Sequence, residues 1–163
     1  MAARNKKGEA TPAIVTLQRA GVHFDVHQYT HDPRVDSYGL EAAQALGVDA
    51  DRVFKTLMVD LDGALVVGIV PVSRSLDLKA VAAVLGGRKA LLAQADRAQR
   101  ATGYVLGGIS PVGQKRQHRS ALDESAESWP TVFVSGGRRG LDVEVAAGDL
   151  RRLIGAVLAP IAR

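Results

Sequence analysis

The sequence of 163 residues contains no cysteine. This absence excludes disulfide bonds, thiolate metal ligands and a cysteine nucleophile supplied by the protein, and it is compatible with a reducing compartment. No apolar run approaches the roughly 20 residues of a membrane-spanning helix, and residues 1–10 lack the apolar segment of a secretory signal. We therefore expect a soluble cytoplasmic protein without a membrane partner.

Sequence motifs for the common cofactors and nucleophiles are also missing. The chain has no P-loop, no G-x-G-x-x-G dinucleotide motif and no G-x-S-x-G nucleophile elbow. Its 4 histidines show no metal-ligand spacing such as H-E-x-x-H, so we expect neither a metal nor a cofactor. Such a protein can still cleave an activated ester if backbone N–H groups stabilise the developing oxyanion and the substrate is held in place.

Positive charge exceeds negative charge, with 21 lysines and arginines against 17 aspartates and glutamates. The basic residues gather at residues 4–7, 97–100, 115–119 and 138–139. A basic surface favours a polyanionic partner such as RNA, although solvated charge without any partner explains the balance equally well. The length fits one domain, which we expect at residues 11–163 after a disordered basic leader at residues 1–10.

Apolar periodicity and turn residues predict alternating helices and strands. The predicted helices cover residues 12–20, 40–46, 76–85, 96–102 and 150–158, and the predicted strands cover residues 22–29, 55–61, 64–70, 89–93, 131–134 and 141–145. Ser75 is expected to cap the third helix, and Asp62 and Gly63 are expected to form a hairpin turn. Interleaved helices, strands and hairpins predict an α/β or α+β fold with a mixed sheet.

The stretch T-G-Y-V-L-G-G-I-S-P-V-G-Q-K at residues 102–115 has the composition of a ligand-binding loop. Gly107 and Gly108 lack a Cβ atom, so a substrate can approach the backbone N–H groups there. A tight turn between two strands is the alternative use of paired glycines. A second glycine-rich turn at residues 135–140 and a lysine, Lys55, in a strand-like run favour ligand binding. For Lys55 the alternative is a strand-end lysine whose head group reaches water.

Three motifs together resemble the YbaK family. They are V-F-K-T-L-M-V at residues 53–59, A-T-G-Y-V-L-G-G-I-S-P-V-G-Q-K-R at residues 101–116 and V-S-G-G-R-R-G-L-D-V-E-V-A at residues 134–146. The family comprises free-standing deacylases that clear cysteine mischarged onto proline tRNA, and it is related to the editing insertion domain of bacterial prolyl-tRNA synthetase. The likeness covers residues 11–161, and the three ordered motifs are specific where each alone is weak.

The resemblance implies a mixed, partly barrel-like sheet wrapped by helices, with the 3′-terminal adenosine and aminoacyl group of a tRNA in a cleft. It implies that Lys55 is the most important side chain and binds phosphate or the carbonyl oxygen, while Gly107 and Gly108 offer backbone groups to the ester. The implied substrate-binding residues are Tyr29, Tyr38, Ser135 and Asp142. The implied partners are the acceptor end of proline tRNA and prolyl-tRNA synthetase.

Each of these substrate-binding residues also has a purely structural interpretation. Tyr29 and Tyr38 are alternatively packing residues at the rim of a cleft. Ser135 is alternatively a turn former, and Asp142 a solvated partner of the arginines at residues 138–139.

The reaction implied by the resemblance is attack by the substrate's own cysteine thiol on its ester, which is consistent with a chain that contains no cysteine. Two other functions remain open. One is a deacylase of the same fold for another amino acid such as alanine, and the other is a non-catalytic module that binds tRNA or the synthetase. Pocket size would separate the two enzymes, and RNA binding without ester loss would identify the module.

Overall fold

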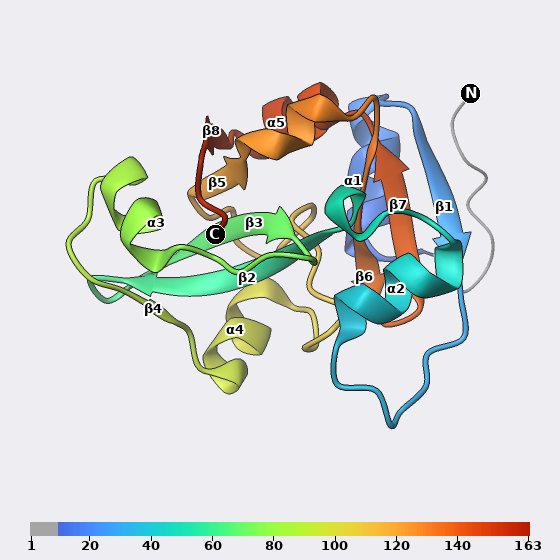
Figure 1. The fold of residues 1–163 in the computed structure, drawn as a ribbon, viewed down its shortest axis with the longest axis horizontal. Helices are drawn as coiled ribbons and strands as arrows, with labels where there is room; N and C mark the ends of the chain where they lie inside the picture. The colour runs from blue at the N-terminus through green and yellow to red at the C-terminus, as the bar shows by residue number, and fades with distance from the viewer. Residues whose placement is uncertain (1–9) are drawn as a thin grey trace.

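The computed structural model describes residues 10–163, which form an α+β fold built on two sheets (Figure 1). The predicted fold class, a single domain with mixed strand directions, is confirmed. The expected leader at residues 1–10 lies outside the described residues except for Ala10. No helix within residues 10–163 is long and apolar enough to cross a membrane.

The larger sheet has five strands in the order β4-β2-β3-β5-β8. These strands are β2 (Phe54–Leu61), β3 (Ala64–Pro71), β4 (Ala90–Leu92), β5 (Ser120–Asp123) and β8 (Val157–Ala159). β2 pairs antiparallel with β3 and β4, whereas β5 runs parallel to β3 and β8. The predicted hairpin turn between β2 and β3 is confirmed, because Asp62 and Gly63 both have positive φ, 53° and 94°, as a two-residue turn matched to the strand twist requires.

The smaller sheet is antiparallel, with the strand order β1-β7-β6. Its strands are β1 (Phe24–Gln28), β6 (Val132–Arg138) and β7 (Leu141–Val145). The glycine-rich turn expected at residues 135–140 is shorter than predicted, because β6 continues to Arg138 through a bulge that begins at Ser135. A bridge between Val53 and Phe133 joins this sheet to β2, and Figure 1 shows β2 reaching from the larger sheet toward β6.

Five α-helices lie within residues 10–163 and cover the two sheets. They are α1 (Pro12–Ala20), α2 (Tyr38–Leu46), α3 (Leu78–Val84), α4 (Ala95–Thr102) and α5 (Ala147–Ile154), with short 3-10 helices η1 (Ala50–Arg52) and η2 (Glu124–Ser128). Thr11 caps α1 as predicted, because its Oγ1 accepts a hydrogen bond from the Ile14 N–H at 3.2 Å. The same hydroxyl donates to the Gly136 carbonyl at 2.5 Å, which ties the start of α1 to β6.

The larger sheet is buried on both faces, because alternate side chains of β2 enter two different apolar clusters. Phe54 and Met58 pack into the cluster that also holds side chains of α1, the smaller sheet and α5. Val59 and Leu61 pack into a second cluster with side chains of α3. Alternation therefore places Lys55 and the residue that follows it on opposite faces of β2, near the start of the strand.

The helix predicted over residues 150–158 is wrong in its last turn. α5 ends at Ile154, where Gly155 has a φ of 63° and its N–H bonds back to helix carbonyls. Val157 and Leu158 instead belong to β8 and pair with β5. Apolar spacing over so few residues fits a helix and a buried strand alike, and here the glycine and the pairing with β5 decide.

Two further differences between prediction and structure concern the start of α3 and the strand β5. Ser75 does not cap α3; the cap is Asp77, whose carboxylate accepts a hydrogen bond from the Ala80 N–H at 3.1 Å. The backbone of Ser75 instead pairs with that of Arg163. β5 has no counterpart among the predicted strands, because its sequence S-A-L-D contains no β-branched residue to mark it.

Candidate active site

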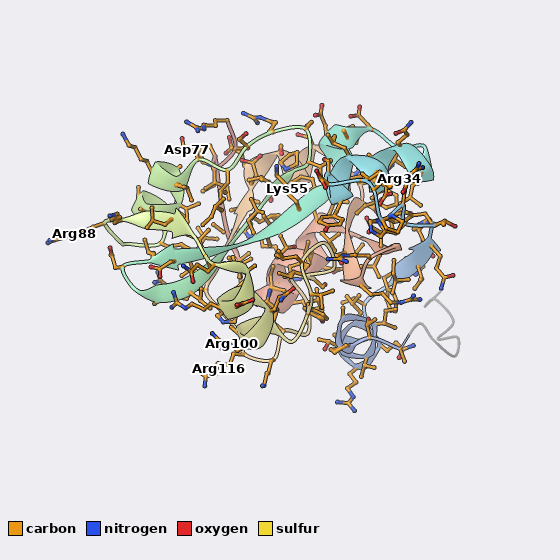
Figure 2. All side chains as sticks on the ribbon, turned by 90° about the horizontal axis from the view of Figure 1, so that it is seen from below. Arg34, Lys55, Asp77, Arg88, Arg100 and Arg116 are labelled. Carbon is orange, nitrogen blue, oxygen red and sulfur yellow. The ribbon has the colours of Figure 1, made fainter. Side chains whose placement is uncertain are left out.

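A cavity of about 310 Å³ opens beside the first residues of β2. Six of the seven residues predicted for the site line it, although they come from distant parts of the sequence. They are Tyr29, Tyr38, Lys55, Gly107, Ser135 and Asp142. Figure 2 shows Lys55 on β2 near the middle of the molecule. The fold thus brings the end of β1, the start of α2, β2, the loop after α4 and the β6–β7 pair around one space.

Lys55 lies opposite Val70 of β3, and its side chain is half-buried. Burial lowers the pKa of its ammonium group from the ordinary value. None of the ion pairs within residues 10–163 involves Lys55. A lysine that lines a cavity without an acidic partner is available to an anionic or carbonyl oxygen of a ligand.

Thr56, the next residue along β2, also lines the cavity. Within residues 10–163, its Oγ1 is the one buried side-chain oxygen or nitrogen without a hydrogen-bond partner. A buried hydroxyl left unpaired costs about 1–3 kcal/mol. Nothing in the sequence pattern marks this residue, because threonine is an ordinary strand former.

Asp142 lies in β7 opposite Ser135 of β6 and is only 5% exposed. Burial raises the pKa of its carboxyl group to about 7. No arginine within residues 10–163 forms an ion pair with it, so the interpretation as a solvated arginine partner is wrong. Tyr29 is affected in turn: burial and then the charge of Asp142 raise the pKa of its phenol to about 12. The Tyr29 N–H donates to the Gly140 carbonyl at 3.0 Å, which fixes the residue beside the β6–β7 turn.

Ser135 combines the two roles that its sequence context allows. Its Oγ accepts a hydrogen bond from the Gly137 N–H at 3.2 Å within the bulge of β6, so it shapes the turn. The same residue lines the cavity opposite Asp142. The hydroxyl therefore stands at the wall of the cavity with one of its acceptor sites already used.

The two glycines predicted as backbone donors differ in position. Gly107 lines the cavity with a φ of 83°, and a Cβ atom there would lie 2.8 Å from the Tyr38 ring. Gly108 is not among the lining residues, and its N–H already donates to the Val105 carbonyl at 2.9 Å. A Cβ on Gly108 would lie 2.7 Å from the Arg138 Cα, so this glycine serves close backbone packing. We therefore do not retain Gly108 as an oxyanion donor.

Tyr38 packs at the rim of the cavity. The Arg139 guanidinium carbon lies 5.0 Å from the centre of its ring, and the His31 ring lies 5.6 Å away. Arg139 also donates from Nε to the Leu106 carbonyl at 2.7 Å. Arg139 thus connects the start of α2 to the loop that carries Gly107, and it fixes both at the mouth of the cavity.

The cavity offers a cationic lysine, a buried carboxyl group, hydroxyl groups and loop backbone. No group of three or more histidine, aspartate or glutamate side chains that could hold a metal ion occurs in the part of the chain that the structure describes. With these groups the site can bind an oxyanion or a polarised carbonyl and orient a polar ligand. This chemistry suits the cleavage of an activated ester whose nucleophile comes from elsewhere.

Comparison with known proteins agrees with this geometry. The family described as aminoacyl-tRNA editing domain matches residues 32–153. The chain belongs to this family. A candidate Cys-tRNA(Pro)/Cys-tRNA(Cys) deacylase of Enterococcus faecalis, EbsC, is 30% identical over 161 residues, which are 98% of this chain and 97% of that protein. Proline–tRNA ligase of Moorella thermoacetica is 38% identical over 73 residues, which are 45% of this chain and 13% of the ligase.

Solved structures show the same fold. A crystal structure of a candidate trans-editing enzyme for prolyl-tRNA synthetase has a TM-score of 0.85 and 25% identity, and the match covers 98% of this chain and 99% of that one. The crystal structure of the hypothetical protein APE2540 has a TM-score of 0.84 and 25% identity, and the match covers 94% of this chain and 100% of that one. The resemblance to free-standing editing deacylases is confirmed, and the protein is an aminoacyl-tRNA deacylase by family.

Proposed function

We propose that the protein removes cysteine that has been mischarged onto proline tRNA, and that the cysteine thiol of the substrate is the nucleophile. The observation that carries the proposal is a cavity that supplies a lysine without an acidic partner, in a chain that contains no cysteine. The name of the Enterococcus faecalis relative, which includes Cys-tRNA(Pro), supports the same substrate.

Binding in this proposal is assigned to residues on the cavity wall. Lys55 donates to a phosphate or to the ester carbonyl oxygen, where a charge-assisted hydrogen bond is stronger than a neutral one. The backbone at Gly107 lies at the same wall and is assigned to the ester, while its missing Cβ leaves room for the Tyr38 ring. Tyr29 and Tyr38 offer aromatic surfaces to the terminal base or the aminoacyl side chain.

The reaction is an intramolecular acyl transfer within the bound substrate. The sulfur of the cysteine side chain attacks the ester carbonyl carbon, a C–S bond forms, and the C–O bond to the ribose breaks. The thiol proton passes to solvent, and the ribose oxygen takes up a proton. The products are free tRNA and a cyclic cysteine thiolactone, which water later opens.

The thiol has two advantages in such a site. With an ordinary pKa of about 8.5 it is a few per cent thiolate at neutral pH, so a nucleophile exists without a protein base. Holding sulfur and carbonyl in attack geometry supplies an effective molarity of about 10⁵ M or more. A serine hydroxyl is far less ionised at this pH, and an alanine side chain has no nucleophile, so both esters should survive much longer.

The test is a deacylation panel with proline tRNA charged with cysteine, serine, alanine or proline. We expect fast release from the cysteine ester alone, with thiolactone as the first amino-acid product, detected by mass spectrometry or by trapping. Comparable rates for cysteine and alanine would contradict the proposal and would indicate a deacylase of broader specificity that uses water. Binding of all four tRNAs without any ester loss would instead identify a non-catalytic module.

A further inference from the structure

A second hollow, away from the residues of the proposed active site, is lined by basic side chains. It has a volume of about 620 Å³ and lies between the start of β3, α4 and the loop before β5. We call it the basic groove; its charged or titratable lining residues are Arg97, Arg100, Lys115, Arg116 and His118. Figure 2 shows Arg100 and Arg116 projecting from the same side of the molecule.

The positive charge of the basic groove is mostly uncompensated. None of its described lining residues is acidic. Arg97 is paired, because its Nη1 lies 2.5 Å from the Asp60 carboxylate and its Nη2 donates to the Gly63 carbonyl at 2.7 Å. Arg100, Lys115 and Arg116 take part in none of the ion pairs within residues 10–163.

His118, which also lines the basic groove, lies partly buried beside Arg116. Burial, and then the charge of Arg116, lower the pKa of the His118 imidazole from its ordinary value. Like charges gathered around one hollow create a positive potential there, which attracts an anion. The Nδ1 of His118 shares a hydrogen bond of 2.8 Å with the Gln114 side chain.

The basic groove is built by the same loop that lines the proposed active site. Residues 106, 107 and 109 of this loop line the active-site cavity, and residues 115–118 line the groove. The loop is held in place between them: the Tyr104 hydroxyl donates to the Val112 carbonyl at 2.7 Å, and the Lys115 N–H donates to the Thr102 carbonyl at 2.8 Å. The two hollows therefore have a fixed relation to each other.

We propose that the basic groove binds the phosphodiester backbone of the substrate RNA several nucleotides before its aminoacylated 3′ end. The proposal rests on the proposed function, since it takes the RNA to be the tRNA whose end occupies the active-site cavity. Arginine and lysine contacts to phosphate carry no sequence information, so the groove would position any tRNA and leave selection to the cavity.

The spacing of the two hollows agrees with this path. Lys55 and Asp60 are five residues apart on β2, or about 17 Å at about 3.3 Å per residue. Lys55 lines the active-site cavity, and Asp60 holds Arg97 at the edge of the basic groove. A strand that advances about 3.4 Å per stacked nucleotide covers this distance in about five nucleotides. A tRNA ends in four unpaired nucleotides, so the groove would meet the backbone where the acceptor helix begins.

The test compares two variants with the same loss of charge. The groove variant carries Arg100→Gln, Lys115→Gln and Arg116→Gln, all on exposed side chains. The control variant carries Arg19→Gln, Lys79→Gln and Arg88→Gln, which are also exposed and line neither hollow. Binding of uncharged proline tRNA is measured across a range of salt concentrations. We expect the slope of log affinity against log salt to fall by about 2 to 3 in the groove variant and to stay unchanged in the control.

A second measurement separates the groove from the chemistry. With charged tRNA, the groove variant should raise KM and leave kcat unchanged, whereas the cysteine ester of adenosine, which is too short to reach the groove, should react equally with both variants. Equal salt slopes for the two variants would overturn the proposal, because the RNA would then respond only to net charge. A groove variant that binds tRNA normally and loses only binding to prolyl-tRNA synthetase would also overturn the proposal. Because uncharged tRNA is the probe, the salt result stands even if cysteine proves not to be the amino acid removed.

Discussion

At the scale of single residues, the start of β2 departs from the pattern of the rest of the strand. Val59 and Leu61 pack into an apolar cluster, whereas Lys55 and Thr56 line the cavity. A charged group with a lowered pKa and a hydroxyl without a partner both cost stability at this position. Such local costs are typical of binding sites, where a ligand supplies the missing interaction.

Replacing Lys55 tests the cation at the cavity. Lys55→Ala should lower kcat/KM for aminoacyl-tRNA about 100-fold or more, since removal of one preorganised donor in an active site has effects of this size. The free energy of unfolding should change by less than about 1 kcal/mol, because the side chain is half-buried and has no ion-pair partner. The control is Lys89→Ala, an exposed lysine just before β4. Near wild-type turnover by a folded Lys55→Ala protein would remove Lys55 from the site.

Thr56 allows a test of the cost of its unpaired hydroxyl. Thr56→Val keeps the shape of the side chain and removes the unpaired hydroxyl, so we expect the free energy of unfolding to rise by about 1 kcal/mol. The control is Thr102→Val: Thr102 is almost fully buried whereas Thr56 is partly buried, and the Thr102 hydroxyl donates to the Ala98 carbonyl at 2.8 Å, so this change should destabilise. Urea denaturation measures the free energy of unfolding of both variants, and a destabilised Thr56→Val protein would contradict the prediction.

At the scale of elements, sequence patterns predicted the parts of the fold that local chemistry controls. Thr11 at the start of α1 and the Asp62-Gly63 turn are both seen, because capping and positive φ depend on the residues themselves. The prediction that the last helix continues beyond Ile154 is wrong, because the pairing of Val157 with Ala121 of β5 makes that segment a strand. Pairing between distant segments leaves no periodicity in a stretch of three residues.

The residues of the candidate site could also be predicted from the sequence in large part. Four of the six predicted residues that share the cavity, Lys55, Gly107, Ser135 and Asp142, lie in the ordered motifs, and Tyr29 and Tyr38 follow from the wider resemblance. The role of Gly108 as a backbone donor could not be checked from the sequence, since its packing against the Arg138 backbone depends on how the β6–β7 hairpin meets the loop. Thr56 gave no signal, because a hydroxyl without a partner is a property of the folded surroundings alone.

Gly107 tests how closely the loop and α2 must approach. Gly107→Ala should lose stability and activity, because the new Cβ would lie 2.8 Å from the Tyr38 ring at a φ of 83°. The control is Gly86→Ala, where φ is 75° but no atom lies within 4 Å of the new Cβ. Both variants carry the cost of positive φ, about 1 kcal/mol, so a larger loss at Gly107 isolates the Tyr38 contact. Equal losses in Tm, with full activity in both, would show that the contact is unimportant.

At the scale of the whole molecule, the cavity lies where the two sheets meet, so groups buried there contribute to global stability. Val53 bridges to Phe133 beside it, and Asp142 of the smaller sheet faces it together with residues of β2. The buried carboxyl of Asp142 has a pKa of about 7 in the folded protein against an ordinary value of 3.8. Between these two values the folded state therefore binds more protons at this site than the unfolded state does.

This difference fixes the direction of the pH dependence. Because the folded protein binds the extra proton, the Asp142 contribution to the free energy of unfolding is highest below about pH 4, falls as the pH rises toward about 7, and is lost above that, by about 4 kcal/mol in total. Asp142→Asn removes the titration and keeps the size of the side chain. We expect the variant to match the wild type near pH 4 and to be more stable above pH 7. Denaturation of both proteins from pH 4 to 8 gives the difference directly, since the histidines titrate in both and cancel. A constant difference across this range, or a wild type that gains stability over the variant as the pH rises, would mean that Asp142 is already ionised and paired in the folded protein.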